Sequence, residues 1–277
     1  MCFNEKPMES ENKEKDLVID VSSSEVRIAL TENKRLIEYD RESTQEQGFS
    51  VGDVLLGRVK KIMPALNAAF VDIGDTKEAF IHYLDLGLYF KAFDSFVKGT
   101  NPNRNPRELF SSIKLGPIVG KEGHIGDYLS VGQMIIAQIV KEPISTKGSR
   151  LTAEISIAGR NIVLLPFAEK VSISQKIQSK EERKRLERLV YSILPKNYGV
   201  IIRTVAEGKK AAVLDAELKG LVPKWEDSWK ILAQTKKVCQ LFSENTRTTT
   251  MLRDLLNDSF TNIYVNDQQV CNEVETY

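Results

Sequence analysis

Aromatic and basic side chains fall on neighbouring predicted strands, where together they could bind nucleic acid. Phe70 and Phe80 lie on adjacent strands, and Arg58 and Lys141 lie on the strands beside them. Aromatic rings stack on nucleobases, at roughly 1–3 kcal/mol per base, while basic side chains contact the phosphates. The alternative is that both phenylalanines belong to a protein core, and the residue types alone favour that alternative.

The dipeptide Arg203-Thr204 is a second candidate, at the end of another predicted strand. A guanidinium fork beside a hydroxyl group can hold a terminal phosphate. Nucleotide hydrolysis is not indicated, because the nearby 208–210 segment (Gly-Lys-Lys) lacks the upstream glycine and the following Ser or Thr of a P-loop. Taken alone, the Arg-Thr pair means little.

Residues for hydrolytic catalysis are not grouped anywhere in the sequence. It contains no Gly-x-Ser-x-Gly motif, no Cys/His cluster and no His-Glu-x-x-His motif. Asp20 and Asp72 each lie in an apolar strand, but two-metal chemistry needs several acids that converge on the ions. We therefore assign no catalytic and no metal-binding residue. An active nuclease that uses Asp20 or Asp72 is the least favoured hypothesis.

Five short strands with glycine-marked turns must position the candidate residues. Strands of this kind are typical of a small closed barrel of the OB type. Residues 87–127 interrupt this barrel with an excursion rich in Gly, Asn and Pro. We expect one short helix over 107–113 and exposed chain elsewhere in the excursion, and we assign it no role. The five barrel strands are predicted at 54–62, 68–73, 79–82, 133–140 and 151–157.

The flanking segments predict a mixture of strands and helices. Ser179 and Glu182 have the spacing of a capping box at the start of a helix, and helical spacing over 214–232 is expected to break or kink at Pro223. The last twelve residues predict no further element. Strands are expected at 17–21, 25–30, 36–39, 162–165, 199–204 and 262–265, a hairpin turn at 31–34 and a helix at 248–258.

The 277 residues carry a net charge of +1 and 42% hydrophobic residues, which suggests about two domains and excludes a disordered or fibrous chain. Residues 51–220 hold 26 basic and 18 acidic side chains, so a polyanion would bind there. The three cysteines are too scattered to indicate disulfides or zinc. The polar leader at 1–16 is not a secretory signal, and no apolar stretch is long enough to span a membrane, which predicts a cytoplasmic protein.

Read in order from residue 17 to the end, the chain resembles the amino-terminal half of the ribonuclease E/G family of bacterial endoribonucleases, in its shorter, ribonuclease G-like form. The segments that carry this resemblance are Gly57-Arg58-Val59, 64–74 (PALNAAFVDIG), 138–142 (QIVKE), 151–159 (LTAEISIAG), 201–204 (IIRT) and 252–254 (LRD).

The resemblance implies an α+β fold in which an RNase H-like subdomain is split in two. Its parts would be residues 17–45 and 220–277. Between them would lie an OB-type RNA-binding barrel of the ribosomal S-one type at 46–142, and a sensor subdomain for the 5′ end of RNA at 143–219 that includes the last barrel strand. The catalytic DNase-like subdomain of the family, with its magnesium-binding aspartates, would follow residue 277.

The resemblance also implies roles for named residues. Phe70 and Phe80 would stack RNA bases, and Lys141 would contact RNA beside them. The 5′-monophosphate would be held by Arg203 and Thr204, and the first nucleotide would contact Gly159 and Val163. Mg²⁺ is implied for the full-length enzyme and is not evident in this chain. The implied partners are single-stranded RNA and, for the full-length protein, further copies of itself.

Two functional hypotheses follow. The first is that the chain is the RNA-binding and 5′-monophosphate-sensing portion of an endoribonuclease that acts in RNA processing and decay. By itself this portion would not hydrolyse RNA. The alternative is a stand-alone regulatory protein that binds single-stranded RNA. The intact mass of the cellular protein would distinguish the two.

Overall fold

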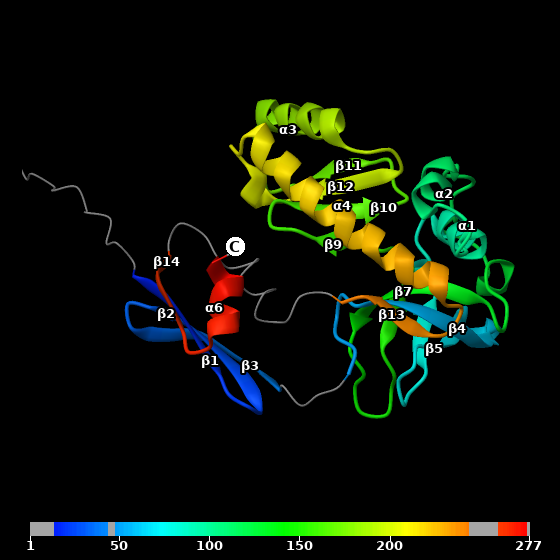
Figure 1. The fold of residues 1–277 in the computed structure, drawn as a ribbon, viewed down its shortest axis with the longest axis horizontal. Coiled ribbons are helices and arrows are strands. Elements are labelled where there is room, and N and C mark those ends of the chain that lie inside the picture. Colours follow the sequence, from blue (N-terminus) through cyan, green and yellow to red (C-terminus); the bar gives the residue numbers. More distant parts are fainter. Residues whose placement is uncertain (1–13, 44–47, 244–259, 276–277) are drawn as a thin grey trace, which may run out of the picture. The chain divides into compact units, whose positions relative to one another are not determined.

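The computed structural model describes residues 14–43, 48–243 and 260–275. The chain divides into two compact units, a smaller one built from both ends of the chain (1–47 and 245–277) and a larger one at 48–244. Figure 1 shows the elements of each unit. The predicted helix at 248–258 and most of the predicted leader lie outside the described residues.

In its described residues, the smaller unit has a four-stranded sheet, in the strand order β14-β1-β2-β3, and one helix. Strands β1 and β14 come from opposite ends of the chain and pair in parallel. Asn33 and Lys34 both have positive φ, so they form the two-residue turn of the predicted hairpin. The elements are β1 (Lys15–Val21), β2 (Glu25–Glu32), β3 (Arg35–Ser43), β14 (Phe260–Val265) and α6 (Gln268–Glu275).

Helix α6 corrects the expectation that the last twelve residues hold no element. The Asp267 carboxylate accepts a hydrogen bond from the Val270 amide at 3.0 Å, which satisfies a free N–H group of the first turn. Val270 and Val274, one turn apart, pack against the sheet core. The signal was present in the sequence as a capping residue followed by two valines at helical spacing.

The larger unit contains a closed five-stranded barrel, which confirms the predicted OB-like architecture within a mixed α+β fold. Its strands follow the order β4-β5-β6-β8-β7, and β4 pairs with β7 to close the barrel. The strands are β4 (Val54–Met63), β5 (Ala68–Asp72), β6 (Ala79–His82), β7 (Met134–Lys141) and β8 (Arg150–Thr152). Short 3₁₀ turns η1 (Pro64–Leu66), η2 (Tyr83–Asp85) and η3 (Ile125–Asp127) connect or precede them.

A second sheet and two helices follow the barrel strands in the larger unit. The sheet has the order β11-β12-β10-β9, and its residues Leu164 and Val200 share a core with Leu186 of α3 and Leu218 of α4. The sensor role expected for residues 143–219 stays a prediction. The elements are β9 (Ile157–Ala158), β10 (Ile162–Pro166), β11 (Val171–Ile173), α3 (Lys180–Ile193), β12 (Tyr198–Ile202), η4 (Thr204–Ala206) and α4 (Ala211–Gln234).

Helix α4 differs from the prediction in two ways. It runs through Pro223 without a break, because Pro223 lies on the exposed face of the helix while Leu221 and Trp225 point into the core. Residues 220–234 therefore continue a helix of the larger unit, and β13 (Cys239–Phe242) pairs with barrel strand β4. The expected boundary at 220 is thus wrong, since this stretch belongs to the larger unit and not to the smaller one.

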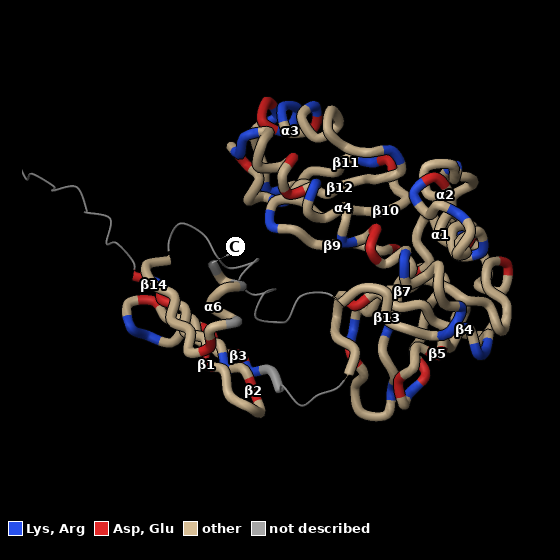
Figure 2. Tube along the Cα trace, in the orientation of Figure 1, with Lys and Arg blue, Asp and Glu red and all other residues tan. Residues whose placement is uncertain are grey.

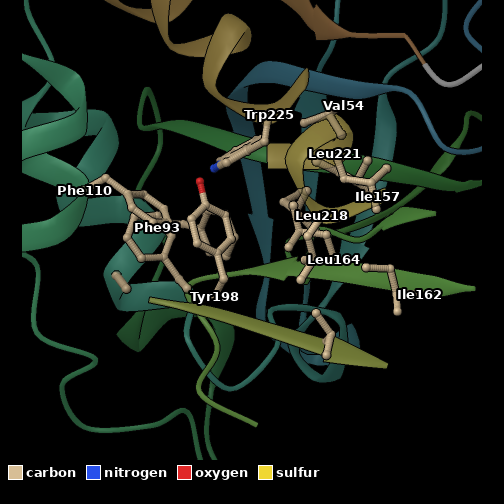
Figure 3. Close-up of a cluster of buried hydrophobic side chains, with 14 of the residues drawn as sticks. Val54, Phe93, Phe110, Ile157, Ile162, Leu164, Tyr198, Leu218, Leu221 and Trp225 are labelled. Atoms are coloured by element: carbon tan, nitrogen blue, oxygen red, sulfur yellow. The ribbon is translucent and has the colours of Figure 1, made fainter. Parts of the chain in front are cut away.

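The excursion at 87–127 holds the short helix expected at 107–113, as α2 (Pro106–Ser112), but the rest is not mainly exposed chain. A further helix, α1 (Phe90–Gly99), precedes α2, and Phe93, Phe96 and Phe110 are buried in one cluster with residues of α4 and β12. Phe110 stacks on Trp229 with ring centroids 4.9 Å apart, and Phe93 contacts Trp225. Figure 3 shows Phe93, Phe110, Tyr198 and Trp225 in one cluster, with the Tyr198 hydroxyl directed toward the Trp225 indole nitrogen. The excursion therefore ties the barrel to the second sheet.

Within the described residues, none of the helices is long and apolar enough to cross a membrane.

Candidate nucleic-acid interface

Phe70 and Phe80 lie outside the barrel core. Their neighbours along β5 and β6, Ala69, Val71, Ala79 and Ile81, are completely buried, whereas both phenylalanines are only half-buried. Successive strand residues point to opposite faces, so both rings project from the outer surface of the barrel. The two residues are direct cross-strand partners, with ring centroids 6.0 Å apart at an interplanar angle of 68°. The core interpretation of these residues is therefore wrong.

The phenylalanine pair is the centre of a row of residues that crosses the barrel strands. Lys61 pairs with Phe70, Phe70 with Phe80, Phe80 with Arg150, and Arg150 with Lys141. The three basic side chains of this row are exposed. We call these five residues the barrel row.

Two β-bulges place both lysines of the barrel row on the outer surface. Val59 and Ile139 point into the barrel core, so strict alternation would also point Lys61 and Lys141 inward. The register shifts between Val59 and Lys61, and again between Ile139 and Lys141. Each bulge adds one residue and reverses the alternation that follows it. The two ammonium groups therefore share a face with the phenylalanines.

Carboxylates pair with some of the basic groups near the barrel row. Asp85 accepts two hydrogen bonds from Arg150, at 3.1 and 3.3 Å, and so fixes its guanidinium. Asp72 lies 3.4 Å from the Lys60 ammonium and is the strand partner of Arg58, two residue pairs beyond Phe70. Basic and acidic residues are interspersed along the larger unit, with several basic residues on α3 (Figure 2).

The predicted sensor residues gather at the open face of the second sheet. Ile162, Leu164, Val200 and Ile202 face the helices, so Val163 and its strand partner Ile201 face the other way. Ile201 is 39% exposed and Val163 is half-buried. Together these two side chains form an apolar strip that ends at Arg203 on the chain after β12.

Arg203 is fixed by the turn between β9 and β10. Its Nη1 donates to the Gly159 carbonyl at 3.0 Å, and its backbone N–H donates to the Asn161 carbonyl at 2.8 Å. Thr204 follows directly, and its hydroxyl lies 3.0 Å from the hydroxyl of Ser174. Gly159, Val163, Arg203 and Thr204 thus lie around one turn and one sheet edge.

The turn between β9 and β10 is held from α4 by Glu217, a residue that the sequence did not single out. The Glu217 carboxylate accepts from the Asn161 backbone N–H at 3.0 and 3.2 Å and from the Asn161 carboxamide at 2.8 Å. A Cβ atom on Gly159 would lie 2.8 Å from the Ile162 backbone carbonyl oxygen and 2.1 Å from Glu217 Oε1, so a side chain there would have to displace the backbone as well as Glu217. Because 56 residues separate Asn161 from Glu217, no local pattern could have revealed this contact.

Glu182, in the first turn of α3, links this helix to Gly208, in the turn before α4. Arg185 donates twice to its carboxylate at 2.7 Å, and the Gly208 amide donates at 2.8 Å. These donors, the Arg185 guanidinium first, lower the pKa of Glu182 from its ordinary value of 4.5 to about 2. The predicted capping residue Ser179 does accept from the Glu182 amide, at 3.3 Å.

The aspartates considered for metal-dependent catalysis are engaged in other contacts. Asp20 accepts from the Asn266 carboxamide at 2.7 Å, and Asp72 accepts from the Gly74 amide at 3.0 Å. Among residues 14–43, 48–243 and 260–275, no three His, Cys, Asp or Glu side chains are grouped so that they could hold a metal ion. The described side chains therefore do not fit the Mg²⁺ that the resemblance implies for the full-length enzyme.

Comparisons with known proteins give a consistent result. Residues 156–277 match the model of the ribonuclease E/G family. Ribonuclease G from Haemophilus influenzae is 32% identical over 265 residues, which is 95% of this chain and 49% of the relative. Ribonuclease G from Escherichia coli strain K12 is 31% identical over 91% of this chain, and ribonuclease E from Nostoc sp. is 32% identical over 82% of this chain and 29% of the relative. The chain spans about half the length of the ribonuclease G relatives.

Proposed function

This chain belongs to the ribonuclease E/G family, and from that premise we propose that it binds single-stranded RNA and recognises a 5′-monophosphate, as part of RNA processing and decay. The barrel row would hold the RNA strand. Arg203 and Thr204 would hold its 5′ phosphate. The observation that carries the proposal is that Phe70 and Phe80 lie outside the barrel core, in direct cross-strand register, with basic residues at both ends of the row.

Several features support RNA binding at the barrel row. Its two aromatic rings offer adjacent stacking surfaces, which accept any base because every base has a π face. Lys61 lies beyond one ring, and Arg150 and Lys141 lie beyond the other. A strand that crosses the barrel along the row would thus meet cationic groups on both sides of its stacked bases. Arg58 lies two residue pairs away along β4 and would contact the same backbone.

Recognition of the 5′ phosphate is supported by the fixed position of Arg203. A guanidinium anchored at one end by the Gly159 carbonyl keeps its orientation, and a preorganised donor fork suits a phosphate group. The adjoining strip of Val163 and Ile201 would contact the first nucleotide. Thr204 would add a hydroxyl donor.

We assign binding and recognition of RNA to this chain, and no hydrolytic step. Mg²⁺ chemistry would belong to the longer family enzymes, in which this portion would position the RNA. A cytoplasmic location and self-association of the full-length protein stay predictions. The alternative, a stand-alone RNA-binding regulator, would use the same two surfaces.

The test is fluorescence anisotropy of a short single-stranded RNA that carries a 5′-monophosphate, compared with the same RNA with a 5′-hydroxyl. We expect tighter binding of the monophosphate form, and loss of that preference in Arg203→Ala. Arg188→Ala, on the exposed face of α3, is the matched control and should keep the preference. Equal affinity for the two RNAs in the wild type would contradict the sensor assignment, and Mg²⁺-dependent cleavage on a gel would contradict the absence of hydrolysis.

A further inference from the structure

We propose that Glu217 of α4 is a positioning residue for the 5′-phosphate contact. Its hydrogen bonds go to Asn161, and it would act by fixing the turn that orients Arg203. This inference rests on the proposed function of Arg203 and adds a second residue to it.

The contacts form a continuous chain from α4 to the guanidinium. Glu217 holds Asn161 through the backbone N–H group and through the carboxamide. The carbonyls on either side of that attachment then accept from Arg203, Gly159 from its side chain and Asn161 from its backbone. Loss of the Glu217 contacts would therefore loosen these two contacts of Arg203 together.

The surroundings of Glu217 restrict the turn. Asn161 is 6% exposed. Its carboxamide nitrogen donates to Glu217, and its carboxamide oxygen has no hydrogen-bond partner among the described residues. Gly159 has no room for a side chain beside Glu217 Oε1 and the Ile162 carbonyl. Charge-assisted bonds of this kind are stronger than neutral ones, so the carboxylate is the principal restraint on the turn.

The sign of the effect separates positioning from simple electrostatics. A carboxylate near a phosphate repels it, so removing its charge should strengthen phosphate binding if charge alone matters. Removing a positioning residue should weaken the same binding, because Arg203 loses its fixed orientation. The two accounts thus predict opposite changes for one substitution.

The experiment measures the affinity ratio between 5′-monophosphate and 5′-hydroxyl RNA for the wild type, Glu217→Gln and Asp215→Asn. Gln keeps the size of the side chain but removes the charge and replaces one carboxylate oxygen with an NH₂ group, which cannot accept a hydrogen bond from the Asn161 backbone N–H. Asp215 is the matched control, because it lies two residues away on α4 and pairs with the exposed Lys219. We expect the ratio to fall at least about ten-fold in Glu217→Gln and to stay within about two-fold in Asp215→Asn.

Each outcome decides a different point. A wild type without any preference would overturn the proposed sensing itself. A wild-type preference that Glu217→Gln keeps or increases would overturn the positioning role only. Binding of 5′-hydroxyl RNA reports whether the variant is folded, since the barrel row is built from other elements. If Glu217→Gln loses that binding too, Glu217→Asp decides. Asp keeps the charge but is one methylene shorter and cannot hold Asn161 in the same geometry, so an unchanged ratio in a folded Asp variant would also overturn the inference.

Discussion

Lys61 on β4 lies directly across from Phe70 on β5, and it does so because the strand carries an extra residue at Lys60. Without this bulge Lys61 would continue the inward alternation that starts from Val59. The same device brings Lys141 opposite Arg150 at the far side of the barrel. Two local irregularities thus assemble a surface on which cationic side chains flank two aromatic rings.

Lys61 and Lys141 should each contribute a phosphate contact. Replacing both with glutamine should weaken single-stranded RNA binding and also reduce its salt dependence, because each lost contact lowers the slope of log affinity against log salt by about 0.7 for single strands. Anisotropy titrations between low and moderate salt measure this slope. Lys114→Gln, an exposed lysine outside the barrel strands, is the control and should leave the slope unchanged. An unchanged slope in the double variant would remove both lysines from the interface.

Asn197 should be a main support of the excursion at 87–127. Its buried carboxamide donates to the carbonyls of Phe110 and Ile113, at the end of α2, at 2.7 and 3.0 Å. Asn197→Ala would leave these carbonyls without that partner, and we expect the free energy of unfolding to fall by about 1–3 kcal/mol. Urea denaturation measures the change.

The backbone at Asn197 has a φ of 64°, so the two causes of destabilisation can be separated. Asn197→Gly loses the same hydrogen bonds but adopts this φ more readily, and should cost less than Asn197→Ala by about 1 kcal/mol. Asn103→Ala, in the exposed part of the excursion, is the control. Wild-type stability in both Asn197 variants would mean that the excursion is not held from this point.

Glu182 should make stability depend on pH. Its pKa is lower in the folded protein, about 2, than the ordinary value of 4.5, so its contribution is complete above about pH 5 and is lost as the pH falls toward 2. The melting temperature of Glu182→Gln should therefore lie below that of the wild type at pH 7, and the difference should shrink between pH 5 and pH 3. Glu187→Gln, exposed on the same helix, should show no such trend. A difference that does not vary with pH would contradict the assignment.

The sequence was sufficient to predict the barrel, because period-two alternation and glycine turns depend on neighbouring residues. The residues that face outward were harder to predict. Alternation gives the wrong face for Lys61 and Lys141, because a bulge leaves no clear sequence signal. Residue types alone do not assign the aromatic pair to the core or to the surface. The structure does, because the barrel interior is filled by Ala69, Val71, Ala79 and Ile81.

The excursion and α4 show a different limit. The Pro- and Asn-rich segment at 101–106 is typical of an exposed loop, but the phenylalanines on either side of it, such as Phe96 and Phe110, are buried. Pro223 predicts a helix break from local chemistry, but the core contacts of Leu221 and Trp225 outweigh that tendency. Contacts between distant residues, such as Asn161 with Glu217, decided what local patterns could not.

The most direct test of RNA binding at the barrel row is the affinity of Phe70→Ala/Phe80→Ala for a 5′-hydroxyl single-stranded RNA, measured by anisotropy. Both rings lie outside the core, so the variant should fold, and Leu84→Ala, at an apolar residue that is 65% exposed just after β6, is the control. We expect binding to weaken by about 2–6 kcal/mol from two lost stacking contacts, with Leu84→Ala unchanged. Wild-type affinity in the folded double variant would contradict the account.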